Sequence, residues 1–180
     1  MLTKNFKICD ISTFISTSGQ PKALVNEEGN TITLSGYTYR HSDVFVTNLY
    51  SGNYSQAKAT TSFPTCVAFG SGEITPTADD FKLDTYVDNS LFTHLSHSYA
   101  NNTSTEGVNN THTITYSFQY TGTTDIFVGE VGLFFKQGQS SNTPMFMLAH
   151  EDIRTTDENG VKHLIKIEPN TTFSVTMVIG

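Results

Sequence analysis

Strict alternation of apolar and polar side chains in two segments most constrains the fold of this chain. Between residues 112 and 120, Ile114, Tyr116, Phe118 and Tyr120 alternate with threonine, serine and glutamine. Residues 172–179 repeat the pattern. Successive side chains of a β-strand point to opposite faces, so a period of two predicts strands with one buried face.

A second kind of apolar segment lies between residues 125 and 135. Here apolar side chains occupy both alternating positions, which predicts a central strand covered on both sides. Gly129 and Gly132 interrupt it, and glycine inside a strand favours a bulge or a close backbone approach. Further strands are predicted at residues 31–37, 43–50, 65–69, 144–150 and 161–168. Residues 90–110 are polar and lack a firm pattern: residues 94–99 could pair as a strand, and residues 101–110 are predicted to form a flexible loop. The sequence from Asp157 to Gly160 predicts a hairpin turn, with Asn-Gly favouring type I′.

Composition supports the same fold class. Aromatic residues make up 12% of the 180 residues and charged residues only 15%, and the remainder is rich in threonine, serine and asparagine. One short helical turn is predicted between Pro76 and Asp80, with Thr75 as its cap. We therefore expect an all-β, mainly antiparallel β-sandwich, with jelly-roll and immunoglobulin-like topologies both open.

The domain organisation predicted is an N-terminal arm or edge segment, residues 1–30, followed by a sandwich domain, residues 31–180. The arm contains apolar residues, among them Phe6, Ile8 and Phe14, that must be covered. It docks either on its own sandwich or on a neighbouring subunit, by addition to a sheet edge.

Charge and cysteine content exclude some classes of partner. The formal net charge is −7, and the 10 lysines and arginines form no dense cluster, so no nucleic-acid partner is expected. No apolar run has the length of a signal peptide or a membrane span, so we expect synthesis in a cytoplasm and no membrane partner. Pairing of Cys9 with Cys66 stays open, although a reducing compartment favours free buried thiols.

No cofactor or metal is expected. His94 and His97 are three residues apart, but no cysteine or carboxylate follows them at ligand spacing. An acidic stretch contains Asp79, Asp80, Asp84 and Asp88, without the pattern of a calcium loop. Two surface histidines and a solvated acidic face explain both features.

The carboxylate that calls for an explanation is Glu130, because it lies inside the apolar segment. A buried carboxylate must be paired, hydrogen-bonded or protonated. We expect an ion pair or backbone hydrogen bonds, although a catalytic carboxylate of a glycan hydrolase is the alternative. The Gly70-Ser71-Gly72 sequence lacks the residues of a nucleophile elbow or a phosphate loop. It predicts a turn, which Glu130 would brace.

Two motifs carry a resemblance to a known class of proteins. Residues 67–72 (VAFGSG) and 75–80 (TPTADD), followed by residues 128–134 (VGEVGLF), resemble an ordered pattern in small β-sandwich structural proteins of tailed bacteriophages. Segments like residues 147–150 and 173–179 follow in those proteins. The resemblance covers about residues 65–180.

The resemblance implies a non-enzymatic virion protein of a tail, baseplate, collar or capsid surface, made in a host cytoplasm. Its partners would be copies of itself or other virion proteins. Its structural residues would be Gly70, Gly72, Glu130 and Gly132. A carbohydrate- or receptor-binding module is the alternative function, and a glycan hydrolase is a third. Tyr37, Tyr39, Tyr50 and Tyr54 are candidates for an exposed sugar-stacking surface.

Overall fold

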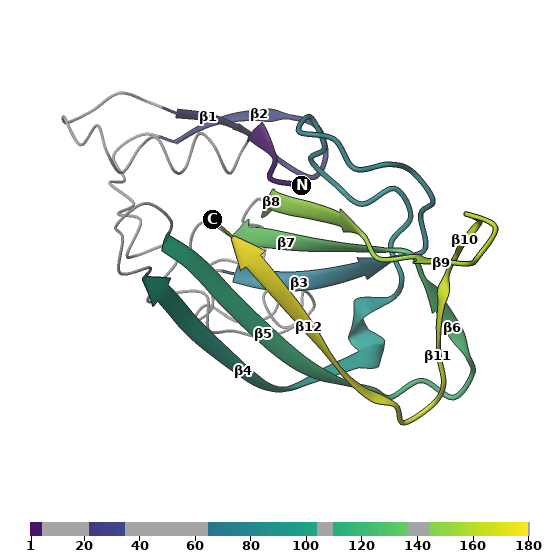
Figure 1. The fold of residues 1–180 in the computed structure, drawn as a ribbon. Helices are drawn as coiled ribbons and strands as arrows, with labels where there is room; N and C mark the ends of the chain where they lie inside the picture. The colour runs from purple at the N-terminus through teal and green to yellow at the C-terminus, as the bar shows by residue number, and fades with distance from the viewer. Residues whose placement is uncertain (5–21, 35–64, 104–109, 137–144, 180) are drawn as a thin grey trace.

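The computed structural model describes residues 1–4, 22–34, 65–103, 110–136 and 145–179 (Figure 1). Every pair of strands in this part of the chain is antiparallel, which confirms the all-β, mainly antiparallel prediction. The strands are β1 (Lys22–Val25), β2 (Thr31–Leu34), β3 (Thr65–Gly70), β4 (Phe92–Thr103), β5 (Asn110–Tyr120), β6 (Ile126–Val128), β7 (Glu130–Lys136), β8 (Met145–Asp152), β9 (Thr155–Thr156), β10 (Lys162–His163), β11 (Ile165–Ile167) and β12 (Thr172–Ile179).

Two three-stranded sheets face each other across one core. Their strand orders are β12-β5-β4 and β3-β7-β8, and Figure 1 shows them as two layers. Both sheets contribute buried side chains to the same apolar cluster, including Phe69 from β3, Leu133 from β7 and Phe118 from β5. This two-layer packing is what a β-sandwich requires, and its finer topology stays a prediction.

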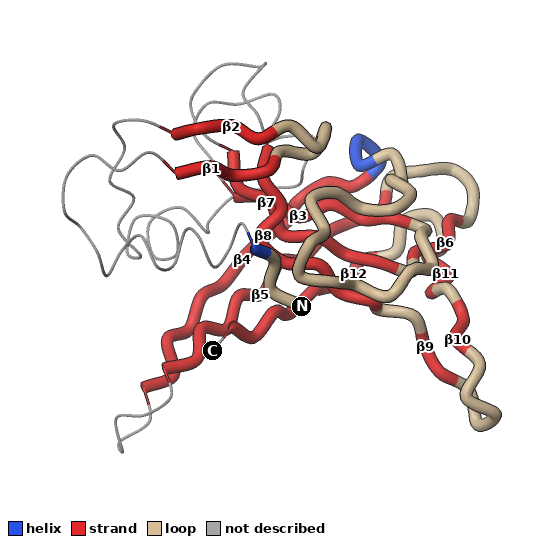
Figure 2. Tube along the Cα trace, turned by 90° about the horizontal axis from the view of Figure 1, so that it is seen from above, coloured by secondary structure: helices blue, strands red, loops and turns tan. Residues whose placement is uncertain are grey.

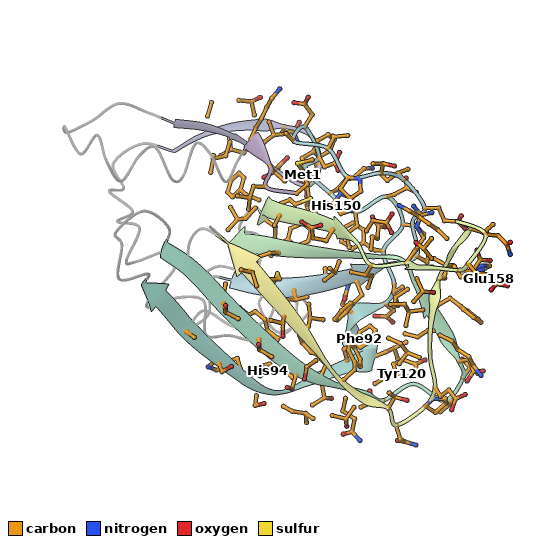
Figure 3. All side chains as sticks on the ribbon, viewed as in Figure 1. Met1, Phe92, His94, Tyr120, His150 and Glu158 are labelled. Carbon is orange, nitrogen blue, oxygen red and sulfur yellow. The ribbon has the colours of Figure 1, made fainter. Side chains whose placement is uncertain are left out.

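The alternating segments form the paired strands β5 and β12. The four apolar residues predicted to share a face of β5 are each at most 1% exposed. Phe92 of β4 packs on Tyr120 of β5 in this core, with 5.6 Å between the ring centroids (Figure 3). On the outer face, hydroxyl pairs join Thr115 to Thr176 at 2.9 Å and Ser117 to Ser174 at 2.8 Å. The period of two is therefore confirmed as the signal of an inner and an outer face.

The segment 125–135 forms two strands rather than one. Gly129 separates β6, which pairs with β11, from β7, which lies between β3 and β8. The Gly129 N–H donates to the Gly70 carbonyl at 2.8 Å, and its own carbonyl accepts from the Ile153 N–H at 2.9 Å. These bonds turn the backbone out of the sheet. The prediction of a covered strand holds for β7, where residues 131–134 are all buried. The segment 161–168 divides similarly, into β10 and β11.

The helical turn predicted between Pro76 and Asp80 is wrong. The Asp80 carboxylate accepts a hydrogen bond from the Thr77 N–H at 2.8 Å, and the Lys4 N–H donates to the Ala78 carbonyl at 2.7 Å. These bonds close a turn and occupy a carbonyl that a helix would need. Within the described residues, the short 3-10 helix η2 instead spans Asn89–Leu91 and is capped by Asp88.

The hairpin predicted at residues 157–160 joins β9 to β10 and protrudes from the body (Figure 2). Its turn is not type I′, because among the two residues of the Asn-Gly pair only Gly160 has a positive φ, 81°. The Asp157 carboxylate accepts from the Asn159 and Val161 N–H groups at 2.9 and 2.8 Å. These bonds favour a type I turn closed by a left-handed glycine.

The predicted division at residue 30 cuts through a hairpin. β1 pairs with β2, and Leu24 of β1 is 1% exposed in the core. At the start of the chain, Leu2 bridges to Ala149 and the Thr3 N–H donates to the Leu148 carbonyl at 3.0 Å. Residues 1–3 thus extend the outer edge of β8. The remaining arm residues 5–21, the strand predicted at 43–50, and Cys9 lie outside the described residues.

Candidate functional site

A long loop, residues 71–88, lies over the outer face of the β3-β7-β8 sheet, and we call it the covering loop. The Ser71 N–H donates to the Thr85 carbonyl at 2.8 Å, and the Val87 N–H donates to the Phe69 carbonyl at 3.0 Å. Leu83 packs with residues of all three strands in a second apolar cluster, which consists of Ala68, Leu83, Phe134, Met145 and Met147. The sheet is therefore buried on both faces.

Glu130, the first residue of β7, fixes this loop to the sheet. Its side chain is 2% exposed. One carboxylate oxygen, Oε1, accepts from the Gly72 N–H at 3.1 Å and from the Thr85 N–H at 3.0 Å. The other, Oε2, accepts from the Asp84 N–H at 3.1 Å. Glu130 thus has the geometry of the brace that the sequence predicts, although its effect on stability stays a prediction.

His150 joins Glu130 to the covering loop a second time. Its Nε2 lies 2.8 Å from Glu130 Oε2, and its Nδ1 lies 2.6 Å from Asp80 Oδ2. A carboxylate can only accept hydrogen bonds, so contact with two ionised carboxylates requires both ring nitrogens to carry protons. With both carboxylates ionised, His150 is an imidazolium between them. We call the three residues the Asp80–His150–Glu130 triad.

A β-bulge directs the His150 side chain toward Glu130 and Asp80. The register between β7 and β8 shifts between Leu133 and Phe134, so Leu148 and Ala149 both belong to the inner core cluster. His150, which pairs with Gly132, then falls on the outer face with Met147. Unbroken alternation would instead place His150 on the inner face with Phe146 and Leu148.

The triad's titration behaviour follows from burial opposed by hydrogen bonds. Burial acts to raise the pKa values of Glu130 and Asp80, but bonds to His150 and to backbone or Thr77 groups outweigh it and lower both pKa values. Burial acts to lower the pKa of His150, but its bonds to the two carboxylates outweigh it and raise that pKa.

These directions define the pH range in which the triad stabilises the fold. The carboxylates contribute above their ordinary pKa values of 4.5 for Glu130 and 3.8 for Asp80, and lose that contribution as pH falls through the lowered values. His150 contributes below its ordinary pKa of 6.5 and loses that contribution as pH rises through the raised value. The triad is therefore fully stabilising between about pH 4.5 and 6.5.

Of the three glycines named with Glu130, Gly70 and Gly72 permit close approach to its carboxylate. A side-chain carbon added at Gly70 or Gly72 would collide with Glu130 Oε1. One added at Gly132 would come within 2.6 Å of the Phe134 ring. The structure therefore brings Gly70, Gly72 and Glu130 to one place, with Gly132 opposite His150 in the sheet. The partner that the sequence analysis missed is His150, although its position at the end of an apolar run is the same signal that identified Glu130.

The buried groups of the triad hydrogen-bond to one another and to the covering loop. Glu130 and His150 are 2% and 0% exposed, and every hydrogen-bonding position named above is taken by the protein. A glycosidase needs two carboxylates on either side of a cleft that admits a sugar. Here both carboxylates instead bind the same histidine.

The other candidate side chains are described only in part. A bulge in β4 after His94 brings His94 Nε2 to 3.3 Å from His97 Nδ1, with the rings stacked. Within the described segments, no group of three or more histidine, cysteine or acidic residues could hold a metal ion. In the acidic stretch, Asp80 binds His150 and Asp88 caps η2. The strand aromatics Tyr116, Phe118 and Tyr120 are buried, whereas Tyr37, Tyr39, Tyr50 and Tyr54 lie outside the described residues.

Comparisons of this chain with protein-family models, curated proteins and solved structures gave no match. In the described part of the chain, no helix has the length and apolarity needed to cross a bilayer.

Proposed function

We propose that this chain is a non-enzymatic structural protein of a bacteriophage particle, a subunit of a tail, baseplate, collar or other appendage. It works by assembling with copies of itself or with other virion proteins. Its two-layer β fold and its buried polar site support a role as a building block.

The observation that carries the proposal is the meeting of two sequence motifs at one carboxylate. The glycine motif at residues 67–72 and the Glu130 motif at residues 128–134 are about sixty residues apart in the chain. In the fold, Gly70 pairs with Glu130, and Glu130 accepts the Gly72 N–H. By these two motifs the chain resembles phage structural proteins. Their contact gives a structural reason for the glycines and Glu130 to occur together.

The test is the location of the chain in particles. Virions purified by density gradient from a lysate that contains the chain should hold it at a stoichiometry fixed relative to a coat protein, as measured by quantitative mass spectrometry. Washing at high salt should leave that ratio unchanged. A chain found entirely in the particle-free fraction would contradict the proposal.

A separate assay addresses the enzymatic alternative. Any hydrolysis of bacterial surface glycans by the purified chain that is lost in Glu130→Gln and retained in Glu158→Gln would overturn the non-enzymatic assignment. Glu158 is the matched control because it is exposed at the tip of the β9–β10 hairpin (Figure 3).

A further inference from the structure

The two histidines of β4 lie on one face of their sheet because the strand carries a bulge. In a regular strand, residues three positions apart point to opposite faces. The register of β4 against β5 shifts between His94 and Ser96. Before this shift His94 pairs with Phe118, which is buried in the core. After it, His97 pairs with Tyr116, which is buried on the same face of β5. The bulge therefore directs both imidazoles to the same side of the sheet.

The two rings have the separation of two ligands on one metal ion. His94 Nε2 lies 3.3 Å from His97 Nδ1, and the ring planes are 16° apart. Two nitrogens that bind one tetrahedral zinc ion at about 2.0–2.1 Å each lie about 3.3–3.4 Å from each other. One cation can thus be reached by both nitrogens with little movement of either side chain.

The surroundings of the pair favour neutral imidazole, the form that binds metals. Both side chains are half-buried, and the aromatic rings of Phe118 and Tyr116 lie 5.9 and 6.2 Å from the His94 ring. Burial lowers the pKa of His94, and the neighbouring His97 ring lowers it further. A metal binds a ring nitrogen only where that nitrogen carries no proton, so resistance to protonation favours metal binding.

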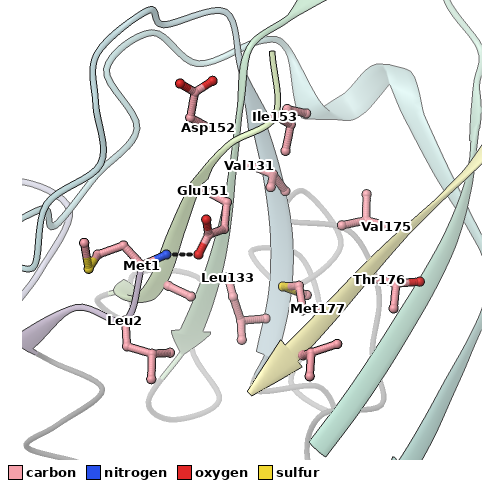
Figure 4. A pocket seen from close by; sticks show the side chains of 12 residues that line it. Met1, Leu2, Val131, Leu133, Glu151, Asp152, Ile153, Val175, Thr176 and Met177 are labelled. Atoms are coloured by element: carbon pink, nitrogen blue, oxygen red, sulfur yellow. Dashed lines mark ion pairs between the residues drawn. The ribbon is translucent and has the colours of Figure 1, made fainter. Parts of the chain in front are cut away.

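A groove of about 480 Å³ between β12 and the β7–β8 layer is a second recess beside acidic side chains (Figure 4). Glu151, which lines it, pairs with the amine of Met1. Asp152 pairs with Arg154 and Lys162. A metal ion bound in the groove would have to displace these partners, whereas at the histidine pair it replaces only a hydrogen bond between the two rings.

We propose that His94 and His97 form a binding site for a divalent transition-metal cation of the kind that suits imidazole, such as zinc, nickel or copper. His94 binds through Nε2 and His97 through Nδ1. With both rings neutral, the ring that donates in the metal-free pair moves its proton to its other nitrogen, so no net proton is released. Within the described residues no third histidine, cysteine or carboxylate joins the pair, so water completes the coordination.

Calorimetric titration of the purified chain with zinc chloride tests the proposal, at about pH 7.5, where imidazole is neutral. It should show one site per chain. Two ligands supply about half the binding free energy of a four-ligand structural site, so we expect a dissociation constant on the order of 10 µM. His94→Ala and His97→Ala should each raise that constant at least about tenfold, and circular dichroism checks that each variant is folded.

His163→Ala is the matched control, because His163 is exposed and pairs with Asp157 rather than with a second histidine. It should leave the dissociation constant for zinc unchanged. An excess of magnesium chloride should also leave it unchanged, since magnesium prefers oxygen ligands. A change with either the control variant or magnesium would place the zinc elsewhere and overturn the proposal.

Proton–nitrogen correlation spectra of the histidine rings test the geometry on the wild-type chain, so the result does not depend on how well a variant folds. Zinc should shift the resonances of His94 Nε2 and His97 Nδ1, the two coordinating nitrogens. Coordination through other nitrogens overturns the proposal, as does a wild-type chain that binds no zinc below about 1 mM or an affinity that both alanine substitutions leave intact. These results are independent of whether the chain is found in virions.

Discussion

Removal of the Glu130 carboxylate is expected to destabilise the fold by about 3–5 kcal/mol. Glu130→Ala leaves the buried Gly72 N–H without its acceptor, at a cost of about 1–3 kcal/mol. The N–H groups of Asp84 and Thr85 are partly buried, so water can replace part of what they lose. The same change leaves the buried His150 cation with one carboxylate, and breaking a buried pair costs about 3–5 kcal/mol. The contributions overlap because they share one side chain, so they do not add.

Glu130→Gln separates the hydrogen-bonding function from the charge. The amide carbonyl can still accept from Gly72 and Thr85, but the amide NH₂ then faces the Asp84 N–H and His150. Nε2 of His150 can become an acceptor if it loses its proton, whereas the Asp84 N–H cannot. We expect a cost of about 1–3 kcal/mol, below that of Glu130→Ala.

Equilibrium urea unfolding at pH 6, followed by circular dichroism, measures both variants against wild type. Glu158→Gln, the exposed hairpin residue, should change the free energy of unfolding by no more than about 0.5 kcal/mol. A Glu130→Ala protein that is also within about 0.5 kcal/mol of wild type would refute the argument. Such a result would mean that the covering loop does not depend on its carboxylate bonds.

Three further predictions concern residues around the same core. The free energy of unfolding, measured from pH 3 to 10, should be highest between about pH 4.5 and 6.5. Its decline above pH 6.5 should become less steep in His150→Gln. A decline that this substitution leaves unchanged would argue against a charged His150. Gly72→Ala should lower the free energy of unfolding by about 1–3 kcal/mol, because the added carbon collides with Glu130. A double-mutant cycle measured by urea unfolding should show a smaller loss in the Glu130→Ala background. Additive losses would contradict the contact between residue 72 and Glu130. Tyr120→Phe removes a 2.7 Å hydrogen bond to the Thr124 carbonyl and should lower thermal stability by about 0.5–1.5 kcal/mol, whereas a neutral change would show that water already satisfies this carbonyl.

Local patterns predicted most strands of the main sheets, but not the full extent of β4, Phe92–Thr103, whose sequence is polar and lacks a firm alternation. β5 and β12 have one buried face, and a period of two reports that burial directly. The break at Gly129 was not predictable in the same way, because its backbone bonds reach Gly70 and Ile153, which are distant in sequence. The helical turn failed for a related reason. Asp80 has the composition of a helix start, but its carboxylate binds Thr77 and His150 instead.

The partner of Glu130 shows where sequence reasoning needs register. A polar residue inside an apolar run predicts that a second one will neutralise it, and His150 follows the apolar run of β8, which pairs with β7. Simple alternation argues against a pair of Glu130 and His150, because it puts His150 on the inner face with Phe146 and Leu148. The bulge at Leu148–Ala149 moves His150 to the outer face, where its imidazole contacts Glu130 and Asp80. A one-residue irregularity in β8 therefore decides whether the two ionisable groups neutralise each other or whether one is buried without a partner.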